Sequence, residues 1–131
     1  MTGPAQPKLL LDTHTLVWAL AAPQNLGPQG IKLLPQGDVV ASAANLWELV
    51  LKIGKNDALV PDPLAWWGRY VTGSSITVLP IRATHVMALA KLPPIHKDPF
   101  DRILVAQATC ENRVLVSRDT VLARYGVAVI W

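Results

Sequence analysis

The sequence predicts an α/β protein with a three-layer α/β/α architecture and a central parallel sheet of about four to five strands. Two observations support this fold class. Short apolar runs alternate with segments of helical pattern, and these runs are hydrophobic at successive positions rather than at every second one. Strands of that kind are buried on both faces, as in a parallel sheet covered by helices. The length of 131 residues fits one domain, residues 1–131, with a flexible tail over residues 1–7.

Five segments have the short apolar pattern of strands. They are residues 8–11, 38–41, 77–81, 114–116 and 127–130. Pro80 lies near the end of the third segment, and proline has no N–H group to donate to a neighbouring strand. The third strand is therefore predicted at an edge of the sheet.

Helices are predicted between the strands, each with a recognisable start or stop signal. They cover residues 13–21, 29–34, 43–53, 64–71, 83–91, 99–111 and 120–124. Ser42 suits the N-cap of the third helix and Gly54 its end. Asp98 followed by Pro99 is the preferred start of the helix over residues 99–111.

The composition limits the function classes. Hydrophobic residues make up 51% of the chain and charged residues 16%, which argues against disorder. No apolar run approaches the roughly 18 residues of a membrane span, and the N-terminus lacks the apolar segment of a signal peptide. A cytoplasmic protein is expected. Because Cys110 is the single cysteine, an intrachain disulfide and a thiolate metal site are excluded. Cys110 lies in the apolar pattern of a predicted helix and is expected to be a small residue of the hydrophobic core.

Two acidic residues follow strands of the predicted sheet. Asp12 comes directly after the strand over residues 8–11, and Asp119 lies three residues after the strand over residues 114–116. Because functional groups of open parallel sheets gather beyond the carboxyl ends of the strands, both are expected at the same edge. Taken alone, each could equally be a helix N-cap or a turn residue.

Three further acids lie on predicted helices. Glu48 stands on a nearly all-apolar helix, so it either forms an exposed pair with Lys52 or is buried with a partner or cation. Asp98 and Asp101 share one helix N-terminus, where the helix dipole stabilises negative charge. Asp98 is the expected cap, and Asp101 points along the buried side of the helix. On the residues alone, either carboxylate could bind or surround a cation.

Carboxylate oxygens without cysteine or clustered histidine favour Mg²⁺ or Mn²⁺ over zinc. Such ions, held by several carboxylates, activate water for attack on a phosphodiester. The net charge of +3 permits a polyanionic partner. Phosphate contacts are predicted for Lys97, Arg102 and Arg118, although each could simply be a solvated cation. No two of the three histidines have the spacing of paired ligands, and His14 is expected to pack against the site rather than to bind metal.

Four segments together resemble the PIN-domain ribonucleases, and in particular the VapC-type toxins of bacterial type II toxin–antitoxin systems. They are residues 9–16, 42–48, 96–102 and 116–119, and the resemblance spans residues 9–131. The segment from Asp98 to Arg102 is its most specific part.

The resemblance implies a PIN-like fold and Mg²⁺- or Mn²⁺-dependent cleavage of tRNA, rRNA or mRNA. It also implies a homodimer and a cognate antitoxin protein as partner. Asp12, Glu48 and Asp101 match the three invariant acids of the family, and Asp119 matches a commonly present fourth. The resemblance thus selects Asp101 over Asp98 as the metal ligand. Supporting contacts around the ligands are expected from Thr13, Asp98 and Ser117.

Two other functions can be weighed against a ribonuclease. A phosphotransferase of the haloacid-dehalogenase type requires a second Asp two residues after the first, and this position is His14. A non-catalytic RNA- or partner-binding module with a vestigial acidic site is the second alternative. Few exposed aromatic residues are expected from the pattern, which disfavours a base-stacking platform.

Overall fold

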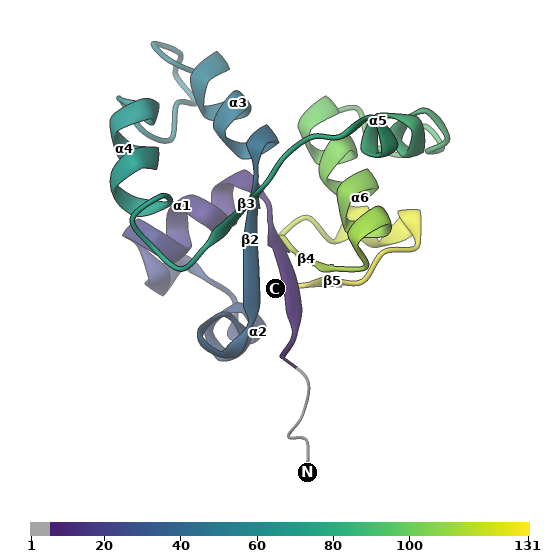
Figure 1. Ribbon diagram of the computed structural model, residues 1–131, viewed down its shortest axis with the longest axis horizontal. Helices are drawn as coiled ribbons and strands as arrows, with labels where there is room; N and C mark the ends of the chain where they lie inside the picture. The colour runs from purple at the N-terminus through teal and green to yellow at the C-terminus, as the bar shows by residue number, and fades with distance from the viewer. Residues whose placement is uncertain (1–5) are drawn as a thin grey trace.

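The computed structural model describes residues 6–131, and its centre is a sheet of five parallel strands in the order β3-β2-β1-β4-β5 (Figure 1). All four neighbouring pairs are parallel. The strands are β1 (Lys8–Leu11), β2 (Asp38–Ser42), β3 (Thr77–Leu79), β4 (Val114–Val116) and β5 (Val129–Ile130). The predicted fold class is confirmed. The predicted tail over residues 1–7 falls mostly outside the described residues and stays a prediction.

Helices connect the strands and cover the sheet on both sides. They are α1 (Thr13–Ala21), α2 (Pro28–Leu33), α3 (Ala43–Leu51), α4 (Pro63–Tyr70), α5 (Ala83–Ala90) and α6 (Pro99–Glu111). Short 3₁₀ turns occur as η1 (Pro23–Asn25), η2 (Leu34–Gln36) and η3 (Thr120–Tyr125). In Figure 1, α1 and α4 lie on one side of the sheet, and α5 and α6 on the other. None of the helices within residues 6–131 is both long and apolar enough to cross a membrane.

The central strand β1 contributes to a separate apolar core on each face of the sheet. Leu10 packs in a cluster with Leu104 and Leu115, whereas Leu9 and Leu11 pack in the cluster on the other face. All three β1 leucines are completely buried. A run of successive apolar residues is therefore what a strand buried on both faces requires. The cores hold the carboxyl end of β1 in a fixed position.

Most element boundaries agree with the sequence prediction, and the differences have local causes. β3 lies at the edge of the sheet as predicted and ends at Leu79, because Pro80 cannot continue the pairing. α3 ends at Leu51, two residues earlier than predicted. The chain then turns, and Gly54 takes a left-handed conformation with φ of +74°.

The prediction that Cys110 is a core residue is wrong. Cys110 is exposed. The continuously buried part of α6 runs from Ile103 to Ala108, where helix and sheet pack together, and the last turn extends beyond this contact. The apolar pattern of the helix does not reveal where its covering neighbours end.

Candidate metal centre

The carboxyl edge of the sheet brings the predicted acids together. The strands β1 and β4 are parallel neighbours, and the backbone N–H of Asp12 donates to the carbonyl of Val116 at 3.2 Å. One pocket at this edge is lined by five carboxylates together with residues of α1, α3 and the segment after β4. Its lining residues are Asp12, Thr13, His14, Thr15, Trp18, Glu48, Lys52, Asp98, Asp101, Arg118 and Asp119. All four predicted site acids thus face one space.

Asp12 combines a cap with an open carboxylate oxygen. It is the N-cap of α1, and its Oδ1 accepts the backbone N–H of Thr15 at 2.8 Å. Its Oδ2 accepts no hydrogen bond from residues 6–131. The two roles left open by the sequence, helix cap and pocket ligand, are therefore compatible, because a carboxylate has two oxygens.

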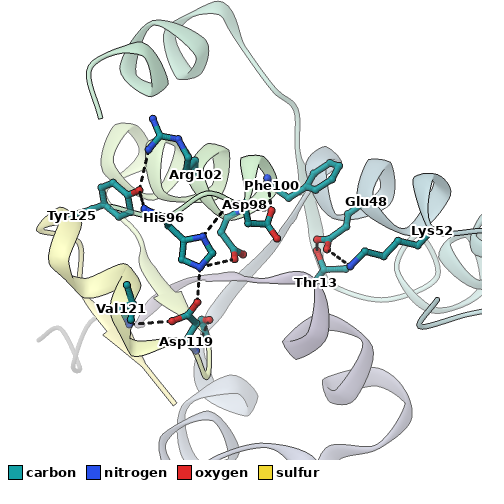
Figure 2. A network of polar contacts seen from close by, with 12 residues as sticks. Thr13, Glu48, Lys52, His96, Asp98, Phe100, Arg102, Asp119, Val121 and Tyr125 are labelled. Carbon is teal, nitrogen blue, oxygen red and sulfur yellow. Dashed lines mark hydrogen bonds and ion pairs between the residues drawn. The ribbon is translucent and has the colours of Figure 1, made fainter. Parts of the chain in front are cut away.

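Glu48 is buried and fully engaged, with only 5% of the residue exposed. The hydroxyl of Thr13 donates to Oε1 at 2.6 Å, and the ammonium of Lys52 lies 2.9 Å from Oε2 (Figure 2). Asn45 donates to Thr13 Oγ1 at 3.1 Å and so fixes the direction of that hydroxyl. Of the two alternatives left open by the sequence, the structure shows Glu48 buried with a partner: the pair with the half-buried Lys52 forms beside the pocket, where α3 packs against α1.

The N-terminus of α6 contributes Asp98 and Asp101 in different roles. Asp98 is the N-cap, and its Oδ1 accepts the backbone N–H groups of Phe100 at 2.8 Å and Asp101 at 3.3 Å. The carboxylate of Asp101 accepts no hydrogen bond from the described part of the chain. Burial, together with the negative charges of Asp98, Asp12 and Glu48, raises the pKa of Asp101 to about 7. His96, whose Nε2 lies 3.7 Å from Asp101 Oδ2, acts in the opposite direction but does not outweigh these effects, and no lysine or arginine of residues 6–131 forms an ion pair with Asp101.

His96 is a pocket neighbour that the sequence reasoning did not identify, because it has no paired-ligand spacing with another histidine. Its Nδ1 accepts the backbone N–H of Asp98 at 3.0 Å, so the neutral ring carries its proton on Nε2. Nε2 therefore donates to Asp119 Oδ2 at 2.8 Å (Figure 2). The same nitrogen lies 3.7 Å from Asp101 Oδ2. The sequence signal that could have identified His96 as a pocket neighbour is its position two residues before the capping Asp98.

The atoms of His96, Asp101 and Asp119 lie within 4.8 Å of one another, close enough to hold a metal ion together. The tautomer argues against His96 as a ligand. A histidine that binds metal through one nitrogen donates the N–H of the other, whereas here Nδ1 is an acceptor. Two more hydrogen bonds fix the position of Asp119. Its Oδ1 accepts the backbone N–H of Val121 at 3.1 Å, and its own N–H donates to Ser117 Oγ at 3.0 Å.

The donor set of the pocket fits a hard divalent cation. Its open donors are carboxylate oxygens, which Mg²⁺ and Mn²⁺ prefer. The hydroxyl of Thr15, a residue that lines the pocket, is completely buried and has no hydrogen-bond partner within residues 6–131. Because this hydroxyl is shielded from solvent, it is not counted among the open donors of the pocket.

The basic residues near the site differ in position. Arg118 lines the pocket, and its guanidinium carbon lies 5.4 Å from the ring centre of Trp18. Burial lowers the pKa of Lys52, but its contacts with Glu48 and Asp57 outweigh this and raise it above the ordinary value. Lys97 is exposed next to His96 and Asp98. Arg102 does not line the pocket: it donates to the Pro93 carbonyl at 2.9 Å and to Tyr125 Oη at 3.0 Å.

The fold and the pocket define an α/β domain with an acidic centre at the carboxyl edge of a parallel sheet. The chain belongs to the PIN domain family, whose sequence model matches residues 9–128. PIN domains are generally nucleases that use divalent metals. A comparison with curated proteins gave no significant match.

Solved structures share this fold along nearly the whole chain. FitAcB from Neisseria gonorrhoeae is 20% identical, with a TM-score of 0.68 over 94% of this chain and 96% of that one. VapBC2 from Rickettsia felis, bound to a DNA fragment from its promoter, is 17% identical, with a TM-score of 0.67 over 93% and 96%. DNA-bound VapBC from Salmonella typhimurium is 18% identical, with a TM-score of 0.68 over 95% and 97%. The TM-scores establish a common fold, and at identities of 17–20% the comparison extends no further than the fold.

Proposed function

We propose that this PIN domain is a Mg²⁺- or Mn²⁺-dependent endoribonuclease that cleaves RNA phosphodiester bonds with activated water. The observation that carries the proposal is the convergence of Asp12, Glu48, Asp101 and Asp119 in one pocket at the carboxyl edge of the sheet. Four carboxylates drawn from the segments after β1 and β4 and from two different helices repel one another. A bound divalent cation offsets that repulsion.

When bound, the metal supplies a water of lowered pKa and neutralises charge that develops on the phosphate. The chain itself orients the acids. Asp12 and Asp101 present open oxygens, Thr13 and Lys52 hold Glu48, and His96 holds Asp119. A pocket fixed in this way loses little orientation freedom when RNA and metal bind.

Arg118 is the proposed contact to an RNA phosphate at the pocket. Its charged group is exposed and lies at the pocket wall over Trp18. A guanidinium suits a phosphate because its planar donors can bind two oxygens at once. Lys97 remains a predicted contact at the rim. Arg102 also remains a predicted contact, and its guanidinium would have to leave the Pro93 carbonyl or Tyr125 Oη to bind a phosphate.

We further propose that the enzyme is the toxin of a toxin–antitoxin pair, that it acts in the cytoplasm on tRNA, rRNA or mRNA, and that it forms a homodimer. Its structural neighbours, FitAcB and the two VapBC proteins, support this proposal. An adjacent gene for a small antitoxin, whose product co-purifies with this chain and suppresses its RNA cleavage, is the expected finding. Growth unaffected by expression of the chain alone would contradict the toxin assignment.

The nuclease itself is tested by RNA cleavage with purified full-length protein. Cleavage is expected with Mg²⁺ or Mn²⁺, and it should fall to background in EDTA and in Asp12→Asn or Asp101→Asn. Asp62→Asn is the matched control, because Asp62 also caps a helix but lies exposed at α4, away from the pocket. Full activity of either pocket variant, or undiminished cleavage in EDTA, would refute the proposal. RNA binding without products would favour the non-catalytic binding module instead.

A further inference from the structure

The acids of the pocket are not equally available to a metal ion. Glu48 and Asp119 have both carboxylate oxygens engaged, Glu48 by Thr13 and Lys52, and Asp119 by Val121 and His96. In contrast, both oxygens of Asp101 and the Oδ2 of Asp12 accept no hydrogen bond from residues 6–131. The open oxygens therefore belong to Asp12, Asp101 and the capping Asp98, whose Oδ2 likewise accepts none from residues 6–131.

Lys52 places a positive charge where a second cation would otherwise bind. Its Nζ lies 2.9 Å from Glu48 Oε2 and 3.4 Å from Asp57 Oδ2, and its side chain is only 22% exposed. A divalent ion bound to the same Glu48 oxygen would lie within a few ångströms of this ammonium. Repulsion between like charges at such a distance is strong in a partly buried site. Lys52 is thus held by two carboxylates against displacement.

At the opposite end of the pocket, His96 offers no lone pair to a second ion. The Nε2 of His96 carries a proton in the neutral ring, since Nδ1 accepts the N–H of Asp98. Nε2 therefore donates to Asp119 rather than offering a lone pair to a metal. Asp119 is left as an outer acid that can contact a metal-bound water.

We propose that the centre binds one divalent cation directly through Asp12 and Asp101, and that the ammonium of Lys52 takes the place of a second cation beside Glu48. The inference deepens the proposed nuclease function and rests on it. It makes Lys52 the residue that sets metal stoichiometry. Glu48 and Asp119 then act on the ion from outside its direct ligands.

The test counts Mn²⁺ ions bound per full-length chain by electron paramagnetic resonance. One ion per chain is expected for the wild-type protein. Lys52→Met keeps the aliphatic stem but removes the charge, so Glu48 Oε2 and Asp57 Oδ2 lose their shared ammonium partner. A second ion with a spin-coupled Mn–Mn signal is then expected. Lys55→Met is the matched control and should bind one ion. Lys55 is exposed, three residues further on, and forms no ion pair within the described chain.

Each outcome decides the inference. Two spin-coupled ions in the wild-type protein overturn it while leaving the nuclease proposal intact. One ion in folded Lys52→Met, with unchanged affinity, refutes the role given to Lys52. No bound Mn²⁺ in the wild-type protein, with cleavage that persists in EDTA, defeats the proposed function itself. If circular dichroism shows Lys52→Met unfolded, Lys52→Gln replaces it, since its neutral amide can still donate to Glu48.

Discussion

Asp101 has the least compensated charge in the pocket. Burial and the neighbouring carboxylates of Asp98, Asp12 and Glu48 raise its pKa from 3.8 to about 7. Between these two values the folded protein keeps a proton that the unfolded chain releases. Its contribution to folding stability is therefore present at low pH and lost as the pH rises through this window. The group thus favours unfolding at neutral pH when no cation is bound.

We predict that the metal-free protein loses stability from pH 5 to pH 8 and that Mn²⁺ restores it at pH 8. Asp101→Asn removes the buried charge and should flatten this part of the profile, adding about 1–2 kcal/mol to the free energy of unfolding at pH 8 in EDTA. Urea unfolding at several pH values measures both effects. A profile for Asp101→Asn parallel to that of the wild-type protein would contradict the assignment.

Substitutions of His96 can separate the roles of its two ring nitrogens. His96→Asn retains an acceptor for the Asp98 N–H but cannot reach Asp119, whereas His96→Gln supplies a donor near the position of Nε2. Cleavage at saturating Mn²⁺ should fall about 10–100-fold in His96→Asn, as is typical when a ligand-orienting partner is lost. It should fall less in His96→Gln. Equal rates in the two variants would show that the Nε2 donor does not orient Asp119.

At the scale of elements, the start of α3 connects the sheet to the site through Asn45. This completely buried amide accepts the N–H of Ser42 at 2.7 Å and donates to the Leu11 carbonyl at 3.2 Å and to Thr13 Oγ1 at 3.1 Å. Thr13 in turn donates to Glu48. The capping box of α3 thus also orients a residue of the pocket.

Asn45→Ala should destabilise the protein by about 2–3 kcal/mol, because it leaves buried backbone groups without partners. It should also lower cleavage, since Thr13 loses the group that directs its hydroxyl toward Glu48. Denaturant unfolding and cleavage rates measure the two effects, with the exposed Asn56→Ala as control. A loss below about 0.5 kcal/mol would mean that solvent or neighbouring groups replace these bonds.

The elements were predictable because their signals are local. Strand 8–11, helix 13–21 and the Asp98–Pro99 helix start follow from apolar runs and caps within a few residues. The environment of individual side chains was less predictable. The burial of the Glu48–Lys52 pair depends on α1, and the contact of His96 with Asp119 joins positions 23 residues apart. The exposure of Cys110 depends on where α6 leaves the sheet. These side-chain environments depend on contacts between segments distant in sequence, which local sequence patterns do not reveal.

For the molecule as a whole, the charges are divided between an acidic pocket and a basic remainder. Five of the nine acids line the pocket together with Lys52 and Arg118, so four acids remain elsewhere against ten of the 12 lysines and arginines. This division suits the proposed RNA substrate, since the basic remainder would attract the phosphate backbone and the acidic pocket would bind the proposed cation. Binding of RNA should therefore weaken steeply as the salt concentration rises.

Arg118 provides the test of this arrangement. In EDTA, where cleavage is absent, Arg118→Ala should weaken RNA binding and reduce the slope of log K against log salt by about 0.7–0.9, the value for one lost phosphate contact. Arg69→Ala is the matched control: Arg69 is also exposed, with its guanidinium 5.2 Å from the ring of Tyr70, but it lies on α4 outside the pocket. Fluorescence anisotropy with a labelled RNA at several salt concentrations gives both slopes. An equal change in the two variants would show that binding reflects overall charge, whereas a change confined to Arg118→Ala would place the RNA backbone at the acidic pocket.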